Sequence, residues 1–235
     1  MSKENLKRLN KELEDTLKKS GVETALLYEP ISDEYWSLEN RIAFCNIEPY
    51  NLDFGWPKGI HTIDESVFED GWIKNKTVGF CAKFAYVYYK TLHGIKVSED
   101  EVRYGLNSVD LIREIRKTAY FNIKPSFSNT IREDKTGVYE LFNKQYFDFV
   151  KNYIKELQPT VLVVGGRDPL NLINEAFDNL NIVYNGIPVF VNNKKICIQS
   201  IKHPSARGVG YKYLFEKVEK LIAFSKVQQE KNWWG

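Results

Sequence analysis

Thr160-Val161-Leu162-Val163-Val164-Gly165-Gly166 is the most strand-like stretch of the chain, and it decides the fold. An apolar run of this length, rich in β-branched residues and ended by glycines, is typical of a strand buried on both faces. Helical patterns lie on either side, from about Val138 to Leu157 and from about Pro169 to Leu180, and Pro159 ends the first. A strand between two helices predicts parallel pairing through crossover connections.

The same alternation extends over most of the chain. We expect further strands at residues 41–46, 118–123, 188–191 and 195–198, and helices from Thr77 to about Leu92, after Ser98 toward Ile115, and up to about Phe224. Ser98 and Glu101 have the spacing of a capping box at the start of the second of these helices. The pattern predicts a three-layer α/β sandwich with a mostly parallel, four-stranded central sheet.

Length and composition favour one domain over residues 1–235, because 43% of the chain is apolar and no composition shift divides it. At its start, Leu6, Leu9, Leu13 and Leu17 recur at helical spacing among charged residues. They predict an amphipathic helix over about residues 5–19, packed on the body of the domain.

Charge and cysteine content narrow the class of protein. The net charge of +2 is too small to establish a polyanion partner, although no Asp or Glu occurs between Asn179 and Phe215, an interval that includes five Lys or Arg. That interval is either a basic binding face or a solvated one. The three cysteines are far apart among apolar neighbours, so we expect no disulfide framework, metal site or cofactor. The chain also has no signal-like or membrane-spanning run, so we expect a cytoplasmic protein.

Polar motifs follow three of the predicted strands: Asn46-Ile47-Glu48-Pro49-Tyr50, then Asn122, then His203-Pro204-Ser205. Ligands of open α/β sheets bind outside the carboxyl ends of the strands. Carboxylate, amide and imidazole groups can move protons or hold a polar ligand. The sequence therefore predicts a site at this edge of the sheet.

In this order, the three motifs resemble those of the uracil-DNA glycosylase superfamily, over residues 41–224. The resemblance implies hydrolysis of the N-glycosidic bond of uracil or another damaged base in DNA, without a metal or cofactor. It assigns the catalytic roles to Glu48, which would activate water, and His203, which would hydrogen-bond the departing base. The chain departs from the family at two positions, since Glu48 replaces the water-activating Asp or Asn, and Asn46 replaces a glycine.

The resemblance also implies the residues that bind the base. Asn122 corresponds to the amide that reads the pyrimidine edge, which suits a group carrying both a donor and an acceptor. Tyr50 would narrow the pocket against a methylated base. Phe54 would stack on the base, with Trp56 as the other aromatic side chain in that segment.

Contacts with DNA fall on the third motif. Ser205 and Arg207 are the expected phosphate contacts, because such contacts position the duplex. Base excision also needs a wedge that takes the place of the flipped base, and Arg207 and Tyr211 are both candidates.

Two alternatives remain open from the sequence. The first is a catalytically inactive relative that binds a nucleobase, a nucleotide or nucleic acid through the same pocket, and Glu48 is the residue that separates it from the enzyme. The second is an interaction protein that uses the amino-terminal helix and the Trp233-Trp234 tail. The expected partner is single- or double-stranded DNA or a nucleobase ligand, and the sequence leaves the oligomeric state open.

Overall fold

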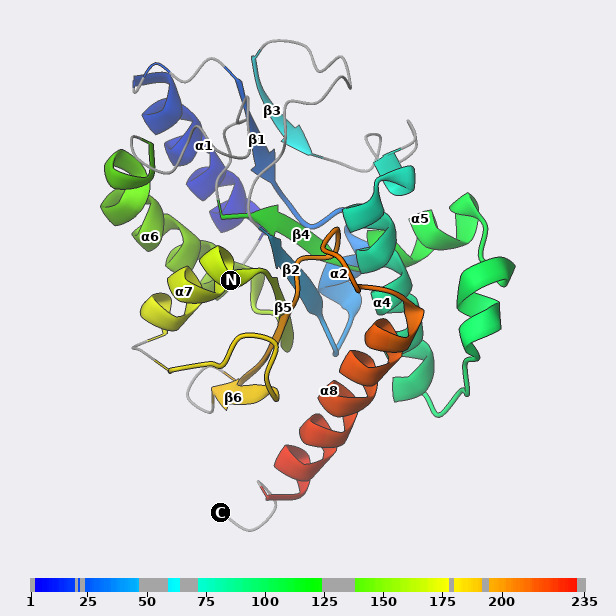
Figure 1. The fold of residues 1–235 in the computed structure, drawn as a ribbon. Helices are drawn as coiled ribbons and strands as arrows, with labels where there is room; N and C mark the ends of the chain where they lie inside the picture. The colour runs from blue at the N-terminus through cyan, green and yellow to red at the C-terminus, as the bar shows by residue number, and fades with distance from the viewer. Residues whose placement is uncertain are drawn as a thin grey trace.

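A five-stranded, mostly parallel sheet flanked by helices forms the centre of the molecule in a computed structural model (Figure 1). The structure describes residues 3–19, 21, 24–46, 59–63, 72–123, 138–177, 180–191 and 195–231. The strands lie in the order β4 (Ala119–Asn122), β2 (Ile42–Asn46), β5 (Val161–Gly165), β7 (Ile196–Ile201) and β6 (Val189–Val191). A separate parallel pair is formed by β1 (Thr24–Tyr28) and β3 (Gly59–Ile63).

The prediction of a mostly parallel sheet is confirmed, but the predicted size of four strands is wrong. The four strands β4, β2, β5 and β7 pair in parallel, and β6 adds a fifth, antiparallel strand at the edge. Only residues 192–195 separate β6 from β7. A connection this short joins antiparallel neighbours, whereas a parallel pair needs a crossover of about a dozen residues or more. The pair of β1 and β3 was also not predicted.

Helices cover the sheet from two sides. In Figure 1, α1, α6 and α7 lie to the left of the sheet, and α4, α5 and α8 lie to its right; the contacts within each group agree. The helices are α1 (Lys3–Lys19), α2 (Glu34–Ser37), α4 (Lys76–Leu92), α5 (Ser108–Arg116), α6 (Val138–Leu157), α7 (Arg167–Ala176) and α8 (Tyr211–Lys231), with short turns η1 (Trp72–Lys74) and η2 (Glu101–Gly105). Helices on both sides explain why every residue of β2, β4, β5 and β7 is buried. None of the helices in the described ranges is long and apolar enough to cross a membrane.

The amino-terminal helix agrees with its prediction. Leu6, Leu9, Leu13 and Leu17 are buried along one face of α1, which packs on α6. Charged side chains on the opposite face form ion pairs such as Lys18 with Glu14, which contribute little at an exposed site. Burial of the four leucines therefore holds this helix to the domain.

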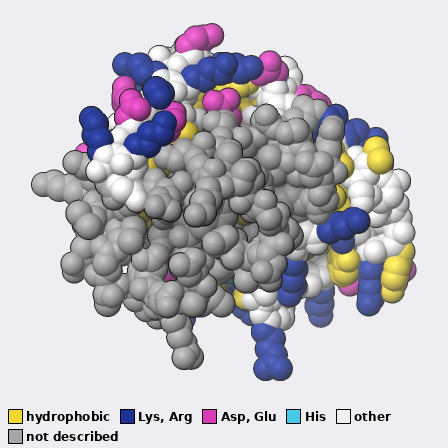
Figure 2. Space-filling view, turned by 90° about the horizontal axis from the view of Figure 1, so that it is seen from above, with side chains coloured by type: hydrophobic (Ala, Val, Ile, Leu, Met, Phe, Trp, Pro, Cys, Tyr) yellow, Lys and Arg dark blue, Asp and Glu magenta, His cyan; other side chains and the backbone are white. Residues whose placement is uncertain are grey.

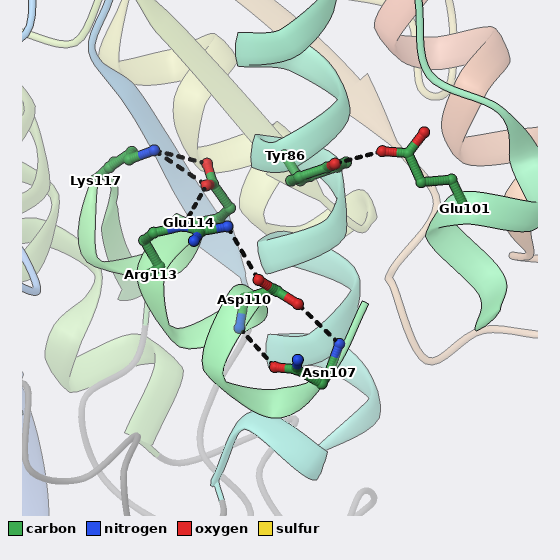
Figure 3. Close-up of polar contacts among 7 residues, drawn as sticks. All are labelled: Tyr86, Glu101, Asn107, Asp110, Arg113, Glu114 and Lys117. Atoms are coloured by element: carbon green, nitrogen blue, oxygen red, sulfur yellow. Dashed lines mark hydrogen bonds and ion pairs between the residues drawn. The ribbon is translucent and has the colours of Figure 1, made fainter. Parts of the chain in front are cut away.

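The helix expected after Ser98 begins later than its capping-box spacing predicts. Ser98 Oγ accepts a hydrogen bond from the Glu101 N–H at 3.1 Å, but the Glu101 carboxylate accepts one from Tyr86 on α4 instead of returning to Ser98 (Figure 3). Burial, with the nearby carboxylate of Glu101, raises the pKa of Tyr86 to about 12. Glu101–Gly105 is a π-helical turn. A tertiary partner has thus overridden a local capping signal.

The α-helix itself begins after Asn107, which forms the complete capping box. Asn107 Oδ1 accepts from the Asp110 N–H at 3.0 Å, and Asp110 Oδ2 accepts from the Asn107 N–H at 3.2 Å (Figure 3). Farther along α5, the buried carboxylate of Glu114 pairs with Lys117 at 3.0 Å and with Arg113 at 3.3 Å. These contacts are local and stabilise the two ends of α5.

Asn107→Ala is expected to lower the free energy of unfolding by about 0.5–2 kcal/mol, the usual loss for an N-cap side chain. The substitution leaves the Asp110 N–H without its acceptor at the first turn of α5. Urea denaturation followed by circular dichroism measures the change. Lys96→Ala, at an exposed position, serves as the control, and equal stability of the two variants would contradict the role of the cap.

Candidate site at the carboxyl edge of the sheet

Two asparagines end neighbouring strands at the carboxyl edge of the sheet. Asn46 of β2 and Asn122 of β4 are register partners, and each side chain is only 3% exposed. The Ile123 N–H donates to the carbonyl oxygen of Asn46 at 2.9 Å, so the pairing continues to the last residue of β2. The predicted base-reading residue Asn122 thus lies directly beside Asn46, at the sheet edge where ligands of such folds bind.

Gly165 brings the His-Pro-Ser loop to the same place. A Cβ atom built on Gly165 would lie 2.3 Å from Asn46 Oδ1 and 3.1 Å from Pro204 Cδ. Both distances are shorter than ordinary van der Waals contact, so only glycine fits between the two side chains without a shift. The end of β2, the end of β5 and the loop after β7 therefore meet around Gly165.

Asn46 has an unsatisfied donor at this meeting point. Its Nδ2 atom makes no hydrogen bond with a described residue. Its side chain lies close to the thiol of Cys81 on α4, whose pKa burial raises and the nearby Asn46 partly lowers. Because a thiol is a weak acceptor, this contact does not satisfy the amide. The sequence did not single out Asn46 as a site residue, and the register shows that its side chain lies beside Asn122.

The loop after β7 holds His203 in a tight turn. His203 Nδ1 lies 2.8 Å from Ser205 Oγ and accepts the Ser205 N–H at 3.3 Å, while the Ala206 N–H donates to the carbonyl oxygen of His203 at 2.8 Å. Since a backbone N–H can only donate, Nδ1 is the acceptor and the proton of the neutral ring is on Nε2. Burial lowers the pKa of His203. The ring is therefore neutral at pH 7 and presents Nε2–H as a donor.

Side chains outside the three sequence motifs anchor this loop. The Lys202 N–H donates to Tyr213 Oη at 2.6 Å, and Tyr213 Oη donates to Asn185 Oδ1 at 2.6 Å. Lys217, 2% exposed on α8, donates to the carbonyl oxygen of Asn185 at 2.8 Å, and burial lowers its pKa. From α4, Lys76 Nζ donates to the carbonyl oxygen of Ser205 at 3.2 Å. The residues on both sides of His203 are thus held by partners on two helices.

Cationic and aromatic side chains continue the surface beside this loop. Lys83 Nζ lies 3.0 Å from Tyr211 Oη, and the guanidinium of Arg103 lies 5.9 Å from the centroid of the same ring. Tyr104 is 73% exposed and packs against Arg103. Seen from above, the described side chains along the right and lower margins of the molecule include many Lys and Arg (Figure 2). Such a surface suits a negatively charged, base-containing partner.

The predicted site residues divide into two groups. Asn122 and the His203 loop reach the same sheet edge through Asn46 and Gly165, and Ser205 contacts the imidazole directly. Arg207 is exposed farther along the loop. Glu48 and Tyr50 of the first motif, and Phe54 after it, lie outside the described residues.

The described part of the chain contains no cluster of three or more His, Cys, Asp or Glu side chains placed to hold a metal ion. Cys45, Cys81 and Cys197 are free and buried, and burial raises the pKa of each thiol, to about 12 for Cys197. A protonated, buried thiol is a poor nucleophile.

Comparison of the chain with models of known protein families gives no match, and comparison with curated protein sequences gives none either.

Proposed function

We propose that the chain is a uracil-DNA glycosylase-like protein, a three-layer α/β sandwich that hydrolyses the N-glycosidic bond of uracil or another damaged base in DNA. The main support is the convergence of Asn46, Asn122 and the His203 loop at one sheet edge, around Gly165. The neutral imidazole adds to it, because its Nε2–H is a donor suited to an oxygen that gains negative charge.

The chemistry follows from these groups. The oxygen of water bonds to C1′ of the sugar, the bond from C1′ to the base nitrogen breaks, and its electron pair leaves with the base. Glu48 takes the proton of the water and offsets the positive charge of the sugar, while Nε2–H of His203 donates to the base oxygen as negative charge develops. Preorganised donors of this type act without reorganising during the reaction, which is why the anchored His203 turn matters.

Recognition of the base is assigned to three further residues. Asn122 offers its amide donor and acceptor to the pyrimidine edge. Tyr50 excludes a methyl group, and Phe54 stacks on the base. All three belong to β4 or to the segment directly after β2, strands that are neighbours in the sheet.

The surface beside the loop is proposed to bind DNA. A base reaches such a pocket only after it leaves the stack, so the protein must hold the flanking phosphates. The proposed DNA-binding surface consists of Ser205 and Arg207, Lys76 and Lys83 of α4, and the exposed Tyr104, on which an unpaired base can stack. A surface of phosphate contacts and stacking groups suits single-stranded or locally opened DNA.

Arg207→Ala is expected to weaken DNA binding by a similar factor for all sequences and to reduce the salt dependence of binding by about one phosphate contact. The side chain is exposed, so the fold should be unaffected. Fluorescence anisotropy of a labelled oligonucleotide at several salt concentrations measures both quantities, with Lys226→Ala at the far end of α8 as the control. An unchanged salt slope would remove Arg207 from the DNA interface.

A second candidate function is binding of a nucleobase or nucleotide without catalysis. Asn46 favours it, because its side chain is buried against Gly165 at the position where the resemblance predicts a glycine. Glu48 favours it as well, since its carboxylate is one methylene longer than that of Asp, and catalytic groups tolerate little displacement.

Release of uracil from single- and double-stranded oligonucleotides tests the proposal and separates the two candidates. The wild-type protein is expected to release uracil, and Glu48→Ala is expected to lose release while it keeps most of its DNA affinity. Both preparations are purified in parallel, so a contaminating glycosylase would give equal release in the two. If the folded wild-type protein binds uracil but releases none, the second candidate replaces the first.

A further inference from the structure

The opposite edge of the sheet holds a cavity that the proposed site does not use. Its volume is about 590 Å³, within the range of pockets that bind small ligands. The lining residues come from the amino-terminal ends of β2, β5 and β7 and from the carboxyl-terminal ends of α6 and α7. Because these strands run parallel, the cavity and the His203 loop lie at opposite ends of the same sheet.

The lining of this cavity is strongly cationic. Four of its residues are basic, namely Arg41, Lys151, Lys155 and Lys195, and none of the described lining residues is acidic. None of the four forms an ion pair with a residue in the described ranges. The carboxyl-terminal ends of α6 and α7 attract cations, but two helix dipoles offset only about one elementary charge. Most of the positive charge of these four side chains is therefore available to bind an anionic ligand.

Arg41, which lines the cavity, also has an unsatisfied hydrogen-bond donor. Its Nε atom is buried and makes no hydrogen bond with a described residue. The guanidinium lies near the buried hydroxyl of Tyr35, whose pKa burial raises and Arg41 partly lowers. Tyr35 already donates its hydroxyl hydrogen to the carbonyl oxygen of Leu157 at 3.0 Å. Because a buried donor without an acceptor is costly, an acceptor that reaches Nε from the cavity would remove this cost.

The apolar residues of the lining narrow the chemical class of the ligand further. Pro159, Ala176, Phe177 and Ile196 are buried and form apolar lining, whereas the lysines are exposed at the rim. A bare inorganic ion would leave this apolar surface wet. A ligand with a phosphate or diphosphate group and an apolar portion would contact both parts, since guanidinium and ammonium groups bind phosphate oxygens through charge-assisted hydrogen bonds.

We propose that the cavity at the amino-terminal edge of the sheet binds a small organic phosphate or diphosphate, held by Arg41, Lys155 and Lys195. This site is independent of the proposed base-excision site. A DNA strand across the same lysines is the competing occupant, and the test separates the two.

Isothermal titration calorimetry with ADP and with pyrophosphate as probes tests the proposal on the full chain. Binding of ADP is expected, with an affinity that falls at least tenfold in the double variant Lys155→Gln/Lys195→Gln. Because both lysines are exposed, this variant should fold normally. Lys96→Gln/Lys226→Gln, which removes two exposed charges elsewhere, is the matched control and should bind as the wild-type protein does.

Two further variants and a competition experiment show whether the cavity binds a small phosphate compound or DNA. Arg41→Met is expected to lower ADP affinity as well, and His203→Ala is expected to leave it unchanged, which separates this site from the proposed catalytic one. The proposal is overturned if neither probe binds, or if the double lysine variant binds both as the wild-type protein does. It is also overturned if a single-stranded oligonucleotide displaces ADP and loses the same affinity in the double variant, because the lysines then serve nucleic acid.

Discussion

Gly165→Ala is expected to lower the free energy of unfolding by about 1–3 kcal/mol, the usual range for an overpacked interior site. The new methyl group would lie 2.3 Å from Asn46 Oδ1 and 3.1 Å from Pro204 Cδ. Asn46 is 3% exposed and has little room to rotate, and the proline ring is rigid. Because Pro204 follows His203 directly, the same shift should displace the imidazole and reduce any activity that depends on it.

Urea denaturation of the variant and of the wild-type protein measures this loss. Gly105→Ala is the matched control, since a Cβ atom there would meet only Glu101 Cγ at an ordinary 3.7 Å. The control is expected to change stability by less than about 0.5 kcal/mol. If both glycine variants are as stable as the wild-type protein, Asn46 and Pro204 do not meet at Gly165.

His203→Ala is expected to slow uracil release by about 100- to 1,000-fold, the usual effect of removing one donor to a developing negative charge. Binding of uracil-containing DNA should change much less, because the hydrogen bond strengthens only as the base departs. Single-turnover release at saturating protein measures the chemical step alone. A rate within a few-fold of the wild-type rate would exclude His203 as the donor.

The pH dependence follows from the lowered pKa of His203. Release should fall only below about pH 6.5, the pKa of an unperturbed histidine, because the ring stays neutral to lower pH in the folded protein. His203 also destabilises the fold in acid: as the pH falls through about 6.5, the unfolded chain binds a proton that the folded one resists. Ser205→Ala removes a donor to Nδ1, so its activity profile should move to higher pH.

The strands were predictable because their signal is local. The apolar residues that begin β2, β4 and β7 and make up most of β5 need burial whatever lies next to them, and the leucines of α1 need one apolar contact. The start expected at Ser98 was wrong because Tyr86, fifteen residues before Glu101, binds the carboxylate of Glu101, whereas the capping box of Asn107 and Asp110 that begins α5 is itself a local signal. The edge strand β6 was recognised as a strand, but its partner depends on sheet order.

The candidate site, too, could be predicted only where the signal in the sequence is local. Asn122 and His203 could be placed at one sheet edge from their positions after strands, and the sheet order agrees with that placement. The anchoring role of Tyr213 could not be predicted, because its hydroxyl contacts Lys202 and Asn185, and neither residue is close to Tyr213 in the sequence. Likewise, Arg41 and Lys195 become neighbours of one cavity only once β2, β5 and β7 are aligned.

Nuclear magnetic resonance of the His203 imidazole nitrogens during a titration with uracil tests most directly whether this edge of the sheet is a nucleobase site. We expect the neutral tautomer with the proton on Nε2 at pH 7, and a shift of the Nε2 signal on addition of uracil that thymine does not reproduce. The uracil-dependent shift should be lost in Asn122→Ala. A proton on Nδ1, or a His203 signal that uracil leaves unchanged, would contradict the proposed site whether or not the chain releases uracil from DNA.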